Sequence, residues 1–87
     1  VGMTRYLATA LAHNGVCVNM ISPGMFPTEG NERRLTAEVR TRLAEATPMR
    51  RLGTVDDLQA AVVFLASNGA KFVTGQNLII DGGWSLW

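Results

Sequence analysis

Apolar side chains recur at helical spacing at the start of the chain, at Met3, Leu7, Ala10 and Leu11. This spacing places them on one face and predicts a helix over residues 1–13. Asn14 and Gly15 follow, and glycine just past a helix end takes up the left-handed conformation that stops a helix. No capping residue precedes Val1, so we expect the helix to start upstream of the given sequence.

Two later segments are predicted to be strands. Residues 16–22, VCVNMIS, are apolar almost throughout and alternate poorly, which favours a strand covered on both faces of a parallel sheet. Residues 76–80, QNLII, are predicted to form a second buried strand that stops at DGG in residues 81–83. Asn19 is the polar exception in the first run, and we expect its amide to clamp neighbouring backbone segments, because a buried amide needs hydrogen-bond partners. Cys17 lies in the same run, where we expect an inert, buried thiol. A single cysteine forms no internal disulfide.

Two further helices are predicted between these strands. One begins at about Thr36, carries only a narrow apolar stripe and is closed by Pro48. The other covers residues 55–67, because Thr54 and Asp57 have the spacing of a capping box and an apolar run follows at once. Apolar residues occupy nearly the whole circumference of this second helix. It should therefore be covered on all sides, which a chain of 87 residues cannot do alone.

The resulting order is helix, strand, lid, helix, strand, which is the alternation of an α/β fold with a parallel sheet. Two strands are too few for such a sheet, so the pattern requires further strands from outside this sequence. Residues 29–47 make a long connection, and long connections in compact domains are commonly functional lids. We therefore interpret residues 1–87 as a segment of a single domain, with a substrate lid at residues 29–47.

Composition and charge exclude several classes of function. The chain is 47% hydrophobic and 17% charged, as a globular protein is. A net charge of +1 provides no field for nucleic acid, and no apolar run approaches the ~20 residues of a membrane span. The arginines within residues 33–51 are interleaved with glutamates, which predicts a solvated surface. The low cysteine content and the lack of a signal peptide in the given sequence favour the cytoplasm.

The junction after the first strand is the candidate binding site. The strand runs into Ser22, Pro23 and Gly24, and Thr28 follows a few residues later. A parallel strand delivers such a loop to the carboxyl edge of its sheet, where open α/β folds bind their ligands. Taken alone, these residues also fit a plain turn after a strand, with Thr28 as a helix cap or loop hydroxyl.

Four stretches, in this order and spacing, resemble the C-terminal part of the short-chain dehydrogenase/reductase family. They are GMTR at residues 2–5, VNMISPG at residues 18–24, RLG at residues 51–53 with DDL at residues 56–58, and VTGQ at residues 73–76 leading to DGG at residues 81–83. The resemblance covers the whole chain. It implies a Rossmann-like, doubly wound parallel sheet, of which this chain is the C-terminal half. It also implies hydride transfer between NAD or NADP and a small alcohol or carbonyl substrate.

The resemblance implies roles for individual residues near the junction. Pro23 and Gly24 open a loop that faces the nicotinamide half of the cofactor. The backbone at Phe26 would pair with the carboxamide, and the Thr28 hydroxyl would contact the carboxamide or the pyrophosphate. A stiff loop can hold a nicotinamide in this way while leaving one ring face open to the substrate. Nothing in these residues distinguishes NAD from NADP.

The resemblance further implies a homo-oligomer, commonly a tetramer. In the family, the elements at residues 55–67 and 76–80 pair with their copies in a neighbouring subunit, which would place Val63 and Phe64 at a two-fold interface. The tryptophan-rich end at residues 84–87 is also expected to make a subunit contact.

The chain departs from the family at the catalytic residues. The family uses a Tyr-x-x-x-Lys pair, whereas Tyr6 is followed at the fourth position by Ala10, and the glycine-rich phosphate loop is absent. Smaller departures are Val55, where proline is common, and Cys17, where arginine is common. We therefore assign no catalytic residue and expect the 87 residues alone to be inactive. We assign no metal site either, because His13 has no partner at ligand spacing. The competing interpretation is a catalytically silent chain that only packs against homologous subunits.

Overall fold

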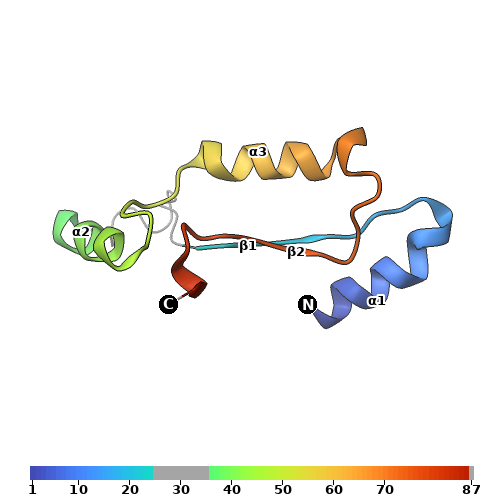
Figure 1. The fold of residues 1–87 in the computed structure, drawn as a ribbon, viewed down its shortest axis with the longest axis horizontal. Helices are drawn as coiled ribbons and strands as arrows, with labels where there is room; N and C mark the ends of the chain where they lie inside the picture. The colour runs from blue at the N-terminus through green and yellow to red at the C-terminus, as the bar shows by residue number, and fades with distance from the viewer. Residues whose placement is uncertain (25–35, 87) are drawn as a thin grey trace. The chain divides into compact units, whose positions relative to one another are not determined.

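A computed structural model describes residues 1–24 and 36–86, and Figure 1 shows the order of the elements. That order is α1 (Gly2–Leu11), β1 (Met20–Pro23), α2 (Ala37–Ala46), α3 (Val55–Leu65) and β2 (Asn77–Ile80). The predicted alternation of helices and strands is therefore confirmed. The chain divides into two compact units, one of Val1–Ser22 with Gln59–Ile79 and one of Pro23–Leu58 with Ile80–Trp87.

The two strands pair with each other in parallel. The Met20 N–H donates to the Gln76 carbonyl over 2.8 Å, and the Gly24 N–H donates to the Ile80 carbonyl over 2.8 Å. The residue numbers of donor and acceptor rise together along the two strands, which is the pattern of a parallel pair. Both strands therefore end at the same edge, as the sequence predicts.

β1 is shorter than the strand predicted over residues 16–22. Ahead of it, the Val18 N–H donates to the Thr74 hydroxyl over 3.0 Å, and the Val18 carbonyl accepts from the Gly75 N–H over 2.8 Å. A side chain thus replaces one backbone partner. Gly75 has a φ of 74°, so the neighbouring segment turns at this point and regular pairing begins only afterwards.

The helix ends follow the capping signals in the sequence. α1 passes into a 3₁₀ turn at Ala12–Asn14, and Gly15 ends that turn in the left-handed conformation with a φ of 77°. α2 begins after Thr36, whose hydroxyl accepts a hydrogen bond from the Val39 N–H over 3.2 Å. α3 ends at Leu65, slightly earlier than predicted.

Few side chains of the described residues are buried. The buried apolar residues are Ala8 and Ala70, whereas Ile79 on β2 is 51% exposed. The expectation of strands covered on both faces is therefore not met among the described residues, because their two strands and three α-helices supply no further layer. Cys17 is exposed as well, contrary to the prediction of a buried thiol, and its Sγ donates to the Lys71 carbonyl over 3.5 Å.

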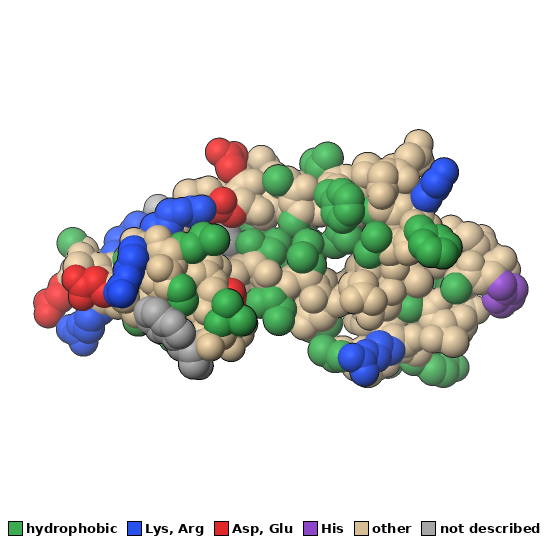
Figure 2. Space-filling model, in the orientation of Figure 1, with side chains coloured by type: hydrophobic (Ala, Val, Ile, Leu, Met, Phe, Trp, Pro, Cys, Tyr) green, Lys and Arg blue, Asp and Glu red, His purple; other side chains and the backbone are tan. Residues whose placement is uncertain are grey.

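α3 shows the same lack of cover. Figure 2 shows apolar side chains at the surface of this helix. The exposed large apolar residues on α3 are Val55, Val62, Val63 and Phe64. None of the helices described is both long enough and apolar enough to cross a membrane.

Candidate functional site

The carboxyl edge of the two strands is built around Gly24. Its N–H makes the last hydrogen bond of the pair, to the Ile80 carbonyl. A Cβ added at Gly24 would lie 2.7 Å from the Cβ of Asp81 and 2.8 Å from its Cα, which is closer than real Cβ contacts come. The φ of Gly24 is not in the left-handed region. Glycine is therefore required here by the close approach of two backbones and not by its conformation. The predicted Pro–Gly break is thus also a contact between the ends of neighbouring strands.

Asp81 organises the turn that follows β2. Its carboxylate accepts hydrogen bonds from the Gly83 N–H and from the Ser85 N–H, each over 2.9 Å. A side-chain hydrogen bond from Ser85, followed by these backbone bonds, lowers the pKa of Asp81 below its ordinary value. Gly82 and Gly83 have φ values of 63° and 94°, so the turn uses two left-handed positions. An ionised carboxylate therefore holds a sharp turn in place.

The far side of this turn contacts the end of α2. A Cβ on Gly82 would lie 2.8 Å from the Cγ2 of Thr47, and a Cβ on Gly83 would lie 3.0 Å from the ring of Pro48. Thr47 is only 4% exposed, and its hydroxyl donates to the Leu43 carbonyl over 2.8 Å. The sequence analysis missed Thr47. The two glycines at residues 82 and 83 were the available signal, because consecutive glycines often mark a close backbone contact.

Asn19 is the predicted clamp. Its amide Nδ2 donates to the Val73 carbonyl over 3.0 Å, and its Oδ1 accepts from the Gln76 N–H over 3.1 Å. Both ends of the side chain are therefore used to join the segment before β1 to the segment before β2. This confirms the structural interpretation, and it leaves the amide no obvious catalytic task.

The start of α3 is held by a small polar cluster. The Asp57 carboxylate accepts from the Thr54 N–H over 2.7 Å and forms an ion pair with Arg51 over 2.9 Å. The hydrogen bond from Arg51, and then that from the Thr54 backbone, lower the pKa of Asp57 well below its usual range. The predicted capping interaction is confirmed, with Arg51 as a partner that the sequence analysis did not assign. These contacts explain the cluster fully as a helix cap, so the cluster is no evidence of a ligand site.

The predicted site residues fall into two groups. Pro23 is exposed and Gly24 is half-buried at the carboxyl edge, whereas Phe26 and Thr28 lie outside the described residues. Within the described residues no group of three His, Cys, Asp or Glu side chains could hold a metal ion. His13 is exposed in the middle of the 3₁₀ turn.

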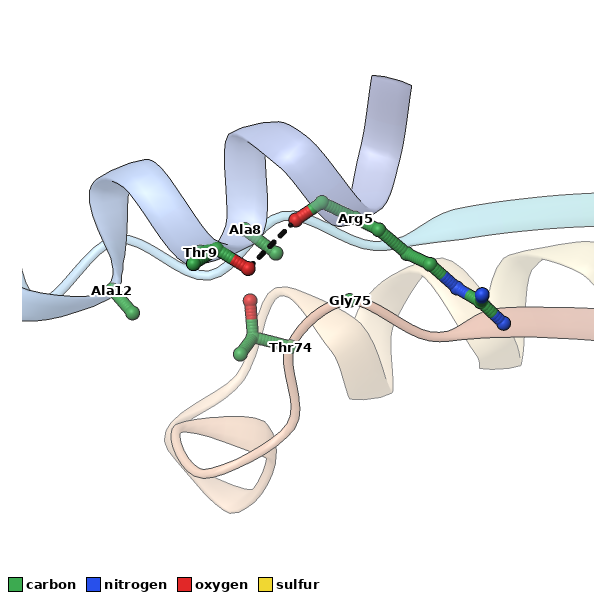
Figure 3. A pocket seen from close by; sticks show the side chains of 6 residues that line it. All are labelled: Arg5, Ala8, Thr9, Ala12, Thr74 and Gly75. Carbon is green, nitrogen blue, oxygen red and sulfur yellow. Dashed lines mark hydrogen bonds between the residues drawn. The ribbon is translucent and has the colours of Figure 1, made fainter. Parts of the chain in front are cut away.

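A groove of about 460 Å³ lies elsewhere, beside α1 (Figure 3). It is lined by Arg5, Ala8, Thr9, Ala12, Thr74 and Gly75. The Thr9 hydroxyl is already engaged, because it donates to the Arg5 carbonyl over 3.0 Å. Apart from Arg5, the residues that line this groove are small and uncharged, so they provide no general acid or base.

Comparisons with known proteins find relatives that match nearly the whole of this chain. The family model described as enoyl-(acyl carrier protein) reductase matches residues 1–85. A 3-oxoacyl-[acyl-carrier-protein] reductase of Buchnera aphidicola is 39% identical over 83 residues, which are 95% of this chain and 34% of that protein. A gluconate 5-dehydrogenase of Gluconobacter oxydans is 42% identical over 82 residues, which are 93% of this chain and 32% of that protein.

Solved structures give the same result. A gluconate 5-dehydrogenase of Burkholderia cenocepacia, in complex with NADP and tartrate, superimposes with a TM-score of 0.89 at 37% identity. The match covers 99% of this chain and 34% of that one. A 4-hydroxyisoleucine dehydrogenase in complex with NADH superimposes with a TM-score of 0.89 at 30% identity, over 99% of this chain and 36% of that one. This chain thus spans about a third of the length of these relatives, and it belongs to the short-chain dehydrogenase/reductase family.

Proposed function

We propose that this chain supplies the nicotinamide side of the active site in an NAD(P)-dependent oxidoreductase that interconverts an alcohol and a carbonyl compound. The observation that carries the proposal is the carboxyl edge, where the end of β1 at Gly24 lies against Asp81 just after β2. Ligands of open α/β folds bind at this edge. Relatives of this chain are dehydrogenases and reductases, and solved neighbours are complexes with NADP or NADH.

The proposed cofactor contacts are Pro23, Gly24, Phe26 and Thr28. The backbone at Phe26 would pair with the nicotinamide carboxamide, and the Thr28 hydroxyl would contact the carboxamide or the pyrophosphate. The described part of the edge offers the exposed Pro23 ring and the backbone of Gly24 as contacts, with Asp81 lying against Gly24. When bound, the cofactor supplies the hydride. This chain's part is to orient the nicotinamide and to exclude water from one side of it.

The substrate pocket and the acid–base chemistry are assigned to different parts of the proposed enzyme. We assign the shaping of the substrate pocket to residues 29–47, of which residues 36–47 are described and contain α2. The described residues bring no acid–base pair to the edge, so the proton would be moved by a Tyr-x-x-x-Lys pair outside this chain. The proposed enzyme works in the cytoplasm on a small molecule.

The exposed surface of α3 supports a homo-oligomer, which we propose to be a tetramer. Val63 is 67% exposed and Phe64 is 47% exposed, and β2 is also uncovered. A self-complementary two-fold contact is the common way to cover such a patch. The same surface is what favours the second candidate function, a catalytically silent chain that acts only as a packing piece.

Two measurements test the proposal. NADH and NADPH are titrated into the complete protein that carries this segment, and binding is followed by nicotinamide fluorescence, with excess oxidised cofactor as competitor. We expect saturable binding of at least one of the two, followed by turnover with a panel of sugars, polyols, 3-oxoacyl thioesters and steroids. Binding of neither cofactor would refute the enzyme. The second measurement is the coding sequence: a frame that extends upstream through a Tyr-x-x-x-Lys pair supports catalysis, and one that starts near Val1 favours the packing piece.

A further inference from the structure

The turn at residues 81–83 lies between two parts of the same compact unit. On one side, the Cα and Cβ of Asp81 fill the space that a side chain at Gly24 would need. On the other side, Gly82 lies against Thr47, and the Gly82 carbonyl accepts a hydrogen bond from the Met49 N–H over 3.0 Å. Gly24 and Thr47 are therefore both in contact with one three-residue turn.

Several interactions make this turn stiff. The Asp81 carboxylate bonds two backbone N–H groups within the next four residues, at Gly83 and Ser85. Gly82 and Gly83 have left-handed conformations that disfavour any side chain, and an added Cβ would crowd Thr47 and Pro48. Thr47 is equally constrained, because it is buried and bonded back to α2 through the Leu43 carbonyl. A displacement of the turn is consequently passed to both neighbours, since packed groups have little free space to absorb it.

Gly24 and Thr47 are also the two ends of one connection, the one between β1 and the residues that follow α2. We propose that the turn at residues 81–83 is a positioning element that fixes Gly24, where the proposed cofactor contacts begin, and Thr47, where the proposed substrate pocket ends. Asp81 and Gly82 are then positioning residues that touch neither the cofactor nor the substrate. This inference rests on the proposed function, which places the cofactor contacts at the start of that connection and the substrate pocket along it.

A purely structural turn would behave differently from a positioning element. If the turn only contributed to folding, its variants would lose stability and activity together. A positioning element shifts the ends of the connection while the rest of the fold persists, so ligand binding changes without a matching loss of stability. The contact between Gly82 and the Thr47 methyl group separates the two cases, because that methyl can be removed by itself.

The test compares three variants of the complete protein. Gly82→Ala places a methyl group 2.8 Å from Thr47 Cγ2, and the double variant Gly82→Ala/Thr47→Ser removes that Cγ2 while keeping the hydroxyl. Gly15→Ala is the control, because Gly15 has a similar φ of 77° but no atom within 4 Å of an added Cβ. It therefore carries the backbone strain without the contact.

The first readout is independent of activity and measures tryptic cleavage after Arg40 and Arg42 on α2. Cleavage of a native protein reports local opening of the segment that is cut. We expect Gly82→Ala to speed this cleavage by about tenfold, as overpacking of one methyl group would give, and to raise by about tenfold the KM of the panel substrate that the wild type turns over. Adding Thr47→Ser to Gly82→Ala should reverse most of both effects. Gly15→Ala should produce neither effect, although it lowers the melting temperature.

Unchanged cleavage in Gly82→Ala would overturn the proposal, as would equal effects in Gly15→Ala or no recovery in the double variant. If Gly82→Ala does not fold, Asp81→Asn is used, since an amide oxygen replaces only one of the two carboxylate acceptors. Asp56→Asn is its control. Faster cleavage in Asp81→Asn alone supports the proposal, and equal cleavage in both refutes it. A wild-type protein that binds neither NADH nor NADPH refutes the proposed function, and the cleavage comparison still decides whether the turn fixes the connection.

Discussion

The turn at residues 81–83 is closely packed, whereas the apolar surface of α3 is exposed. At the turn, Thr47 is 4% exposed, and an added Cβ on Gly24 or Gly82 would meet atoms closer than 3 Å. On α3, Val63 is 67% exposed and has no comparable cover. The turn obtains all of these contacts from residues of this chain. The apolar surface of α3 requires something that the described residues do not provide.

The comparison shows which properties belong to this segment by itself. The contacts that shape the carboxyl edge are local, so they are set by a few glycines, Asp81 and Thr47. Sheet cover and helix cover are not local, because they depend on layers that the two strands and three α-helices of the described residues cannot supply. We therefore expect changes at the turn to alter ligand binding, and changes on α3 to alter assembly.

The largest expected effect comes from testing the segment without the rest of the enzyme. We expect the purified 87-residue chain to show no hydride transfer between NAD(P)H and any carbonyl compound, because its described residues provide no acid–base pair, whose help is worth ~10²–10⁴-fold. The measurement follows NAD(P)H oxidation spectrophotometrically, with the complete protein as the positive control. Measurable turnover by the short chain would contradict this expectation, because it would show that the uncovered surfaces of α3 and the strands need no further layers for function.

The next effect concerns the exposed face of α3. Phe64→Glu should dissociate the complete protein into smaller species or prevent folding, because an unpaired charge buried in an interface costs about 3–5 kcal/mol. Asn14→Asp adds the same charge at an exposed polar position outside the elements at residues 55–67 and 76–80, and should leave the assembly intact. Light scattering on both variants decides the matter. A Phe64→Glu oligomer of unchanged mass and full activity would show that this face is not the interface.

A smaller effect is expected at the capped start of α3. Asp57→Asn should lower the melting temperature at neutral pH by roughly 2–4 °C, a typical value for a lost cap in a domain of this family's size. The folded-state pKa of Asp57 is below its ordinary value, so the stabilisation is present above the unfolded-state pKa and is lost as the pH falls through the folded-state pKa.

The difference in melting temperature between wild type and Asp57→Asn should accordingly shrink in acid. Asp56→Asn removes a neighbouring carboxylate from the same first turn and is the control. Thermal melts of the three proteins across the acidic range provide the test. An equal loss in both variants would attribute the effect to helix charge alone and would leave the Arg51–Asp57 pair without a role.

The smallest expected effect is at Thr28. Thr28→Val should weaken cofactor binding by about 0.5–1.5 kcal/mol, the usual contribution of one hydroxyl hydrogen bond, with the fold intact. Cofactor titration of the complete protein and the variant measures this, and circular dichroism checks the fold. Unchanged affinity and rate would remove Thr28 from the site and would restrict the cofactor contacts to backbone groups.

The fold could be predicted from the sequence wherever a short-range signal determined it. The glycine after α1, the cap formed by Thr54 and Asp57, and the Asn19 clamp each depend on a residue type whose chemistry permits few alternatives. The start of β1 could not be predicted in this way, because it depends on the Thr74 hydroxyl and on the turn at Gly75, far along the chain.

The candidate site was only partly predictable for the same reason. The Pro–Gly break marked the edge, but the contact of Gly24 with Asp81 involves two residues that are distant in the sequence. Thr47 gave no signal of its own, since its burial comes from the turn that packs on it. Cys17 was predicted to be buried on the assumption that both faces of its strand are covered, and in this chain they are not.

A crystal structure of the complete protein with NAD(P)H bound would test directly whether this segment lies on the nicotinamide side of the active site. We expect the nicotinamide to lie at the carboxyl edge beside Pro23 and Gly24, with its carboxamide paired with the backbone at Phe26. We also expect the turn at residues 81–83 to touch Gly24 and Thr47 but not the cofactor. A nicotinamide bound away from residues 23–28 would contradict the assignment of this segment to the cofactor side of the active site.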